Sequence, residues 1–156
     1  MTPFITISDD SIEENGSFDL AVRAVIRHQD EVTLMHLKRS NTYVLPGGGV
    51  HEGESLDTAL AREVTEETGH IVHTATKTLI IREILDGRRR EHHIYAVTVK
   101  EDTTPTNLTD EERDLGMHPV RLPFQEATRI LAKAEGTHKY SEPIQTRELI
   151  ALLSTN

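Results

Sequence analysis

The alternation of apolar and polar residues predicts a mixed series of strands and helices. Residues 18–27, FDLAVRAVIR, combine apolar and β-branched side chains and predict a strand. The dipeptide Asp86-Gly87, between two apolar runs, is a strong signal for a hairpin turn. The whole pattern predicts strands at residues 18–27, 32–37, 43–45, 71–85 (in two pieces) and 92–99, and is compatible with a short one at 120–122.

Residues 56–68 predict a helix with defined ends. Ser55 suits the N-cap position, Asp57 suits the positive end of the helix dipole, and Gly69 suits the residue after the last turn. Strands with helices inserted between them indicate an α+β fold or an α/β sandwich. Later helices are predicted at residues 124–134 and 143–153, while residues 101–116 are polar and predict a loop.

The first predicted helix carries acidic residues on its apolar side. At about 100° per residue, Leu60 and Val64 lie on one stripe, Glu63 and Glu67 fall inside it, and Glu66 lies at its edge. Inward carboxylates are costly unless a partner compensates them, and a set of carboxylate oxygens suits Mg²⁺ or Mn²⁺. A solvated acidic patch near a helix end is the alternative for this segment taken alone.

Three consecutive glycines, Gly47 to Gly49, precede this helix. Glycine permits positive φ and a close approach of a ligand, and a glycine turn before a helix can present amides or carbonyls to phosphates and metals. Gly48 and Gly49 are therefore candidate contacts of a phosphorylated substrate. A tight connection between strand and helix is an equally good interpretation of these glycines taken alone.

Composition narrows the classes of function. The chain has 156 residues, which favours one domain, and 36% hydrophobic with 28% charged residues is typical of a globular protein. Its 17 Lys and Arg against 26 Asp and Glu give a net charge of −9, which argues against binding nucleic-acid polymers or anionic membranes. The absence of cysteine excludes disulfides, thiolate metal sites and a cysteine nucleophile. No apolar run approaches ~18 residues and no basic leader is present, so we expect a cytoplasmic protein.

The segment from Gly48 to Gly69 resembles the Nudix box, G-x5-E-x7-R-E-U-x-E-E-x-G-U, where U is a bulky aliphatic residue. One position departs from the pattern, because the last U is His70, with Ile71 directly after it. By this resemblance the chain is identified as a member of the Nudix (MutT-like) family. The eight positions that match are Gly48, Glu54, Arg62, Glu63, Val64, Glu66, Glu67 and Gly69.

The resemblance implies a Nudix fold, an α/β/α sandwich with a mixed sheet. It implies one domain over residues 1–156, with a core at about 18–134 and with the N-terminal segment and the last helix as elaborations. The implied reaction is hydrolysis, dependent on Mg²⁺ or Mn²⁺, of a diphosphate bond in a nucleoside diphosphate linked to a moiety X, by attack of water on phosphorus. The alternative, a catalytically silent domain that senses nucleotides or binds partners, is disfavoured because the box acids are present.

The resemblance assigns most functional roles to residues of the box. The resemblance implies that Arg62 orients the glutamates and that Glu54 binds a further ion or positions water. The general base is a box glutamate such as Glu66 or an acid of a later loop, for which Glu111 and Glu112 are candidates beside a plain solvated loop. The implied metal ligands are Glu63, Glu66, Glu67 and the backbone carbonyl of Gly47.

Residues outside the box give weaker signals. Tyr43 and Arg39 are candidate substrate contacts, although core packing and a solvated strand end explain them as well. Arg88 to Arg90 form a basic hairpin tip that we expect to be solvated, with phosphate or subunit contact as the alternative. His92 and His93 adjoin them and, on a strand, face opposite ways.

The identity of X is the least determined feature. Three known Nudix subfamilies carry an additional signature: a proline after the box, a tyrosine after the box, or a coenzyme A motif before it. This chain resembles none of the three at those positions. We therefore expect the substrate to be a nucleoside triphosphate or a related small nucleotide. Homodimers are common in the family, but no interface is identified in the sequence.

Overall fold

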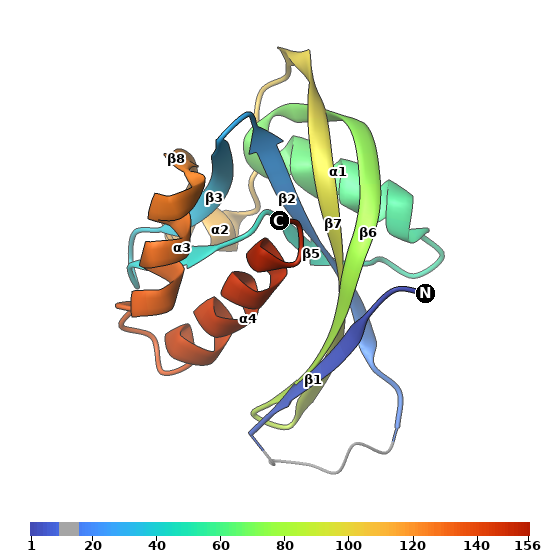
Figure 1. Cartoon of the computed structure of the whole chain (residues 1–156), viewed down its shortest axis with the longest axis vertical. Coiled ribbons are helices and arrows are strands. Elements are labelled where there is room, and N and C mark those ends of the chain that lie inside the picture. Colours follow the sequence, from blue (N-terminus) through green and yellow to red (C-terminus); the bar gives the residue numbers. More distant parts are fainter. Residues whose placement is uncertain (10–15) are drawn as a thin grey trace.

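The structure is a computed structural model that describes residues 1–9 and 16–156, and Figure 1 shows the arrangement of its elements. Within these residues a mixed sheet has the strand order β1-β6-β7-β2-β3-β4, with β5 paired to β2 and β8 paired to β3. Strands β1, β6 and the parallel pair of β7 and β2 make one part, and antiparallel pairs around β3 make the other. The strands are β1 (Phe4–Ser8), β2 (Asp19–His28), β3 (Glu31–Leu37), β4 (Thr42–Val44), β5 (Gly47–Gly49), β6 (His70–Leu85), β7 (Arg88–Thr103) and β8 (Met117–Pro123).

Helix α1 (Leu56–Thr68) covers one face of the sheet and lies behind β6 and β7 in Figure 1. Its ends are those expected: the Ser55 hydroxyl accepts from the Thr58 amide, and Gly69 adopts a left-handed conformation with φ of 76°. Because side chains alternate along a strand, one set of β2 and β7 residues packs against this helix. That cluster contains Val22, Ala24, Ile26, Ala59, Leu60, Val64, Tyr95 and Val97.

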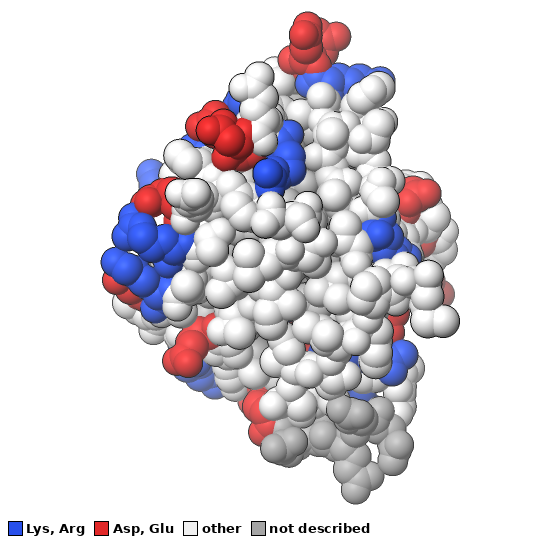
Figure 2. Space-filling model, viewed as in Figure 1, with Lys and Arg blue, Asp and Glu red and all other residues white. Residues whose placement is uncertain are grey.

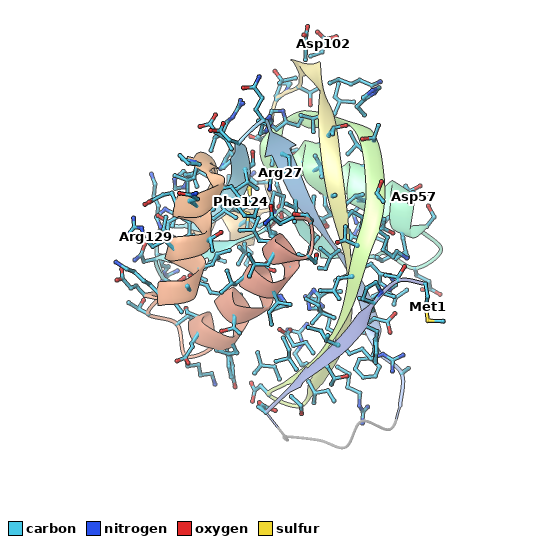
Figure 3. All side chains as sticks on the ribbon, in the orientation of Figure 1. Met1, Arg27, Asp57, Asp102, Phe124 and Arg129 are labelled. Carbon is cyan, nitrogen blue, oxygen red and sulfur yellow. The ribbon has the colours of Figure 1, made fainter. Side chains whose placement is uncertain are left out.

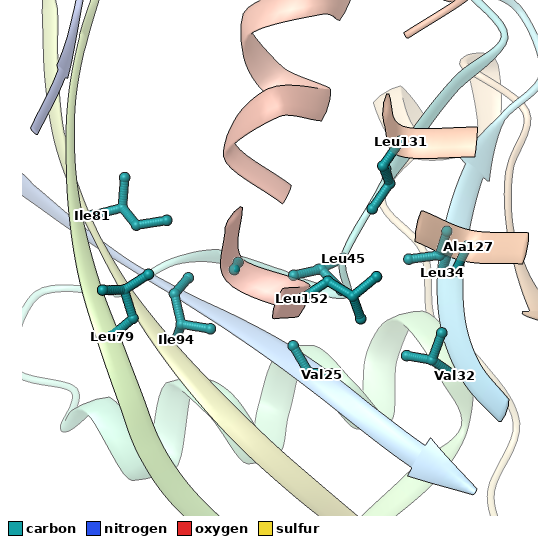
Figure 4. Close-up of a cluster of buried hydrophobic side chains, with 11 residues drawn as sticks. Val25, Val32, Leu34, Leu45, Leu79, Ile81, Ile94, Ala127, Leu131 and Leu152 are labelled. Carbon is teal, nitrogen blue, oxygen red and sulfur yellow. The ribbon is translucent and has the colours of Figure 1, made fainter. Parts of the chain in front are cut away.

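Helices α3 (Phe124–Lys133) and α4 (Ser141–Leu153) cover the opposite face. Figure 4 shows Leu152 of α4 among Val25, Leu45 and Ile94, all of which are fully buried. At the start of α3, the Arg27 guanidinium lies 4.2 Å from the centre of the Phe124 ring (Figure 3). Helices on both faces of a mixed sheet make an α/β/α sandwich, which confirms the predicted fold class.

One face of the surface carries charges of both signs (Figure 2). On the face shown in Figure 2, acidic and basic residues form small separate groups. This face therefore offers no continuous basic surface of the kind that binds nucleic-acid polymers. Among the described residues, no helix combines the length and the apolar character needed to cross a membrane.

The predicted elements are found, with differences where pairing partners are distant. The expected two-piece strand at 71–85 is continuous in β6, and its bulges appear as register shifts against β7. The expected glycine turn is instead strand β5, because β2 supplies its hydrogen-bonding partner. Strand β1 was not predicted, and it exists as the parallel partner of β6. A short helix, α2 (Asp110–Asp114), lies in the expected loop.

We expect Leu152→Ala to lower the free energy of unfolding by about 2–5 kcal/mol, because it leaves a cavity beneath α4 in a close-packed core. Leu153→Ala is the matched control, since the adjacent side chain is 47% exposed and its loss should cost less than about 1 kcal/mol. Urea denaturation measures both. Equal effects would mean that α4 does not belong to the core.

Candidate functional site

The three glycines form a strand, and Gly47 occupies a position that only glycine fits. β5 pairs antiparallel with β2, with Gly47 opposite Arg23 and Gly49 opposite Ala21. Gly47 has φ of 151°, and a Cβ there would lie 2.0 Å from the Val22 carbonyl oxygen. A Cβ on Gly48 would lie 2.5 Å from a Glu63 carboxylate oxygen. The glycines therefore let the backbone lie directly against the acidic side of α1.

The acids on α1 face inward, as the helical wheel predicts. Glu63 and Glu67 are only 8% and 2% exposed, whereas Glu66 is half-buried. The Gly47 amide donates to Glu67 at 3.0 Å. This bond ties the end of the acidic stripe to the glycine strand.

Arg62 connects the remaining acids of the segment. Its guanidinium donates to both Glu54 oxygens at 2.8 and 2.9 Å, to Glu63 at 2.9 Å and to Glu66 at 3.3 Å. It also donates to the Gly49 carbonyl oxygen at 3.1 Å. A planar fork with five donors can hold several carboxylates at once, which agrees with the orienting role expected for Arg62.

The environment separates the pKa values of these carboxyls. Hydrogen bonds from Arg62 and from the His51 amide lower the pKa of Glu54 to about 2. Burial raises the pKa of Glu63, with Arg62 opposing the rise. Burial raises the pKa of Glu67 far more, against the opposing effects of Arg23 and the Gly47 amide. Glu63 and Glu67 are therefore carboxylates whose charge the protein itself leaves undercompensated.

A pocket of about 390 Å³ opens beside these acids. Glu67 and Gly47 line it together with Glu112, whose charge further raises the pKa of Glu67. Glu112 is the N3 residue of α2 and accepts from the amide of its N-cap Thr109 at 2.9 Å. Five arginines also line the pocket: Arg23, Arg88, Arg89, Arg90 and Arg147.

A buried ion network underlies the pocket. Arg147 of α4 donates to Glu83 of β6 at 3.0 Å and to Glu148 at 3.1 Å. Glu148 accepts from the Leu45 amide at 3.1 Å. Arg23 donates to the carbonyl oxygens of Leu45 and Gly47 at 3.2 and 3.4 Å. The network thus holds both the amide and the carbonyl of Leu45, which lies in the segment that leads into the glycine strand.

The histidines after the basic hairpin belong to the interior. His92 lies 3.3 Å from Glu83, and burial together with the charge of Arg147 lowers the pKa of His92 to about 3. His93, on the opposite side of β7, lies 2.8 Å from Glu91. Hydrogen bonds and charge from His92 and Arg147 bring the pKa of Glu83 to about 2, although burial alone would raise it. Neither histidine lines the pocket.

Two predicted substrate contacts lie elsewhere. The Tyr43 ring stacks on His36 with 4.2 Å between centroids and borders a separate, smaller pocket. Arg39 is exposed, and its backbone amide donates to the Leu115 carbonyl oxygen at the strand end. Neither lines the pocket beside Glu67, and neither does the exposed Glu111.

The family model described as the NUDIX domain matches residues 17–142 of this chain. The chain belongs to the Nudix family. The resemblance of its box is thereby confirmed. A curated relative, the uncharacterized Nudix hydrolase YvcI of Bacillus subtilis, is 32% identical over 99 residues. That match covers 62% of this chain and 63% of the relative.

Solved structures confirm the Nudix fold. A NUDIX hydrolase from Nitrosomonas europaea gives a TM-score of 0.65 at 22% identity, covering 86% of this chain and 90% of that one. A MutT NUDIX hydrolase from Burkholderia pseudomallei gives 0.66 at 19% identity, covering 90% and 100%. A structure named UDP-X diphosphatase gives 0.63 at 14% identity, covering 90% and 64%. The sequence relative and the first two of these proteins carry the name hydrolase, which agrees with the predicted enzyme class.

Nudix hydrolases generally use divalent cations, and the donor chemistry of this site fits such an ion. Glu63 and Glu67 are desolvated carboxylates of raised pKa, and the Gly47 amide donates to Glu67. Oxygen donors of this kind suit Mg²⁺ and Mn²⁺. In the described part of the chain, no three acidic or histidine side chains gather closely enough to hold a metal, and Arg62 donates to both Glu63 and Glu66.

Several residues of the site are not evident from the box. Arg23 carries one signal, a charge in the middle of the apolar run AVRAVI. Thr109 and Glu112 carry another, the capping-box spacing S/T-x-x-E that predicts a helix start. Glu83, Arg147 and Glu148 carry none, since their partners are far away in sequence.

We expect Gly47→Ala to destabilise the fold by about 2 kcal/mol or more, because its Cβ would overlap the β2 backbone. Gly49→Ala is the matched control, since its Cβ would meet only Arg90 at 3.5 Å. Thermal denaturation of both variants checks the prediction. A Gly47→Ala protein as stable as Gly49→Ala would contradict the close approach of β5 to β2.

Proposed function

We propose that this protein is a Nudix pyrophosphohydrolase that cleaves the diphosphate bond of a small nucleoside diphosphate derivative with the aid of Mg²⁺ or Mn²⁺. The observation that carries the proposal is the pair of buried carboxylates, Glu63 and Glu67, held against the glycine strand beside a pocket rich in arginine. Their uncompensated charge suits a cation, and the arginines suit phosphate oxygens. A nucleoside triphosphate or related nucleotide is the default substrate, and the whole chain acts as one domain.

Glu63, Glu66 and Glu67, with the Gly47 carbonyl, would hold the cation. When bound, such an ion screens the repulsion between these acids and the diphosphate and acidifies an attacking water. Gly48 and Gly49 leave room for the diphosphate to approach the backbone. Arg62 keeps Glu54, Glu63 and Glu66 in position through its fork of hydrogen bonds.

A glutamate carboxylate accepts the proton of the attacking water. Glu66 of the box and Glu112 of α2 are the two candidates. Glu112 is favoured because it lines the pocket together with Glu67, whose pKa its charge raises. The loop before α2 is held there by two bonds, since the Thr104 amide donates to the Gly69 carbonyl and the Asn107 amide to the Glu66 carbonyl, both at 2.7 Å.

A panel of nucleotides and nucleotide sugars, incubated with Mg²⁺ or Mn²⁺ and assayed for phosphate products, tests the activity. We expect turnover of at least one member and a loss of about 100-fold in kcat for Glu67→Gln and Glu66→Gln, the size typical of removing one electrostatic stabiliser. Asp102→Asn is the control, since this exposed residue lies at the far end of β7 (Figure 3).

Wild-type turnover in both glutamine variants would refute the mechanism. Tight nucleotide binding without turnover under any divalent ion would support the silent-domain alternative instead. Glu112→Gln separates the two candidate bases: a large loss of kcat with unchanged stabilisation by metal assigns the proton to Glu112, and a small loss assigns it to Glu66.

The raised pKa of Glu67 gives a pH dependence whose sign is fixed. A carboxyl with a folded pKa above its unfolded value costs stability as pH rises from the unfolded to the folded pKa, and a cation binds only the ionised form. Stabilisation by Mg²⁺ should therefore grow with pH. Without metal, Glu67→Gln should become increasingly more stable than wild type over the same range. Melting temperatures with and without Mg²⁺ from pH 5 to 8 (about the range of greatest stability) measure both effects; a Mg²⁺ shift that falls with rising pH would contradict them.

A further inference from the structure

The pocket beside the box has an acidic side and a basic side. Glu67 and Glu112 line it near α1 and α2. Arg88 and Arg90, from the start of β7, line it on the side of the β6–β7 hairpin. Arg23 stands between the two sides, because its charge lowers the pKa of Glu67 and also that of Arg90.

The positive and negative charges of the buried network under the pocket balance one another. Arg147 pairs with Glu83 and Glu148, and the Arg23 Nε lies 4.0 Å from a Glu148 carboxylate oxygen. This set of four is neutral as a whole. It therefore leaves no surplus carboxylate to balance the arginines of the hairpin.

Arg90 is a half-buried cation that forms no ion pair with the residues that the structure describes. In β7 it stands opposite Glu83 on one side and Asp19 on the other, yet within residues 1–9 and 16–156 its side chain forms no ion pair with either. Its buried Nε has no hydrogen-bond partner. Burial lowers the pKa of Arg90 first, followed by repulsion from Arg23, Arg88 and Arg147. A cation desolvated among like charges favours an anion beside it.

Arg88 extends the same surface at the mouth of the pocket. It is exposed, and over the described ranges no carboxylate lies within ion-pair distance of it. Asp86 and Asp19 also line the mouth, but both are exposed and neither is paired with an arginine there. The expectation of a fully solvated basic tip is therefore wrong for Arg90 and holds only for Arg88.

We propose that the basic side of this pocket, formed by Arg88 and Arg90, binds a phosphate group of the substrate that is separate from the diphosphate being cleaved. The inference rests on the proposed function and names its substrate class: nucleoside diphosphate derivatives that carry an additional phosphate monoester. The scissile diphosphate lies at the acidic side, where a cation balances it. The hairpin guanidiniums then remain for a second anion, which they match with paired N–H donors.

Matched substrate pairs that differ by one phosphate test this inference. NADH with NADPH, and dephospho-coenzyme A with coenzyme A, are assayed with Mg²⁺ for kcat and KM. We expect the phosphorylated member to have a kcat/KM about tenfold or more higher, through a lower KM, since hydrogen bonds to charged groups have that effect. Arg90→Gln and Arg88→Gln should remove this preference, because they should lower kcat/KM more for the phosphorylated member of each pair than for the unphosphorylated one.

Arg129→Gln is the matched control, because Arg129 is an exposed arginine of α3 that pairs with Glu126 of its own helix (Figure 3). It should retain the full preference. Arg88 is exposed, so its variant keeps the inference testable even if Arg90→Gln folds poorly. Equal kcat/KM within both pairs would overturn the inference. So would an equal loss for both members in Arg90→Gln, which would place the arginines on the diphosphate itself.

A binding measurement separates failure of this inference from failure of the proposed function. If no member of either pair is hydrolysed, the proposed function fails, and calorimetry with adenosine 2′,5′-bisphosphate and AMP still tests the basic site. Tighter binding of the bisphosphate that is lost in Arg90→Gln and Arg88→Gln, but kept in Arg129→Gln, supports the site. Equal binding of the two nucleotides to the wild-type protein rejects it.

Discussion

The buried contact between Arg147 and the carboxylates of Glu83 and Glu148 is the constraint on which the site depends. Each of these side chains is less than a tenth exposed, and the three come from α4 and β6. Unpaired, any one of them would be a charge left in the interior, at a cost of about 3–5 kcal/mol. These ion pairs therefore fix the position of α4 against the sheet. Apolar packing alone would specify that position less sharply.

A series of hydrogen bonds connects α4 to the residues of the candidate site. Glu148 holds the Leu45 amide, Arg23 holds the Leu45 and Gly47 carbonyls, and the Gly47 amide holds Glu67. A box glutamate is thus positioned by residues at least 80 positions later in the chain. Helix α4 was expected to be an elaboration on the core, yet it supplies Leu152 to the core and Arg147 to the pocket.

What the sequence predicts well is local. The ends of α1, the inward direction of Glu63 and Glu67 and the hairpin at Asp86-Gly87 follow from spacing, capping and turn preference. What it misses depends on a partner far away. β5 is a strand only because β2 offers it a ladder, since glycine itself has no preference for strands. The Arg147–Glu83 pair joins residues 64 positions apart, and no periodicity within either element announces it.

The two charged sides of the pocket would allow an acidic protein to accept the phosphorylated ligands proposed for it. With a net charge of −9, the chain repels anions at long range, but screening confines that repulsion to about 8 Å at physiological salt. Inside the pocket the local balance governs, and there Arg90 is desolvated without a partner, while Glu67 is desolvated with too little opposing charge. Each is costly alone, and a metal-bound diphosphate with a second anion would relieve both at once. The uneven charge of the pocket therefore favours ligands that bring both a cation and a second anion.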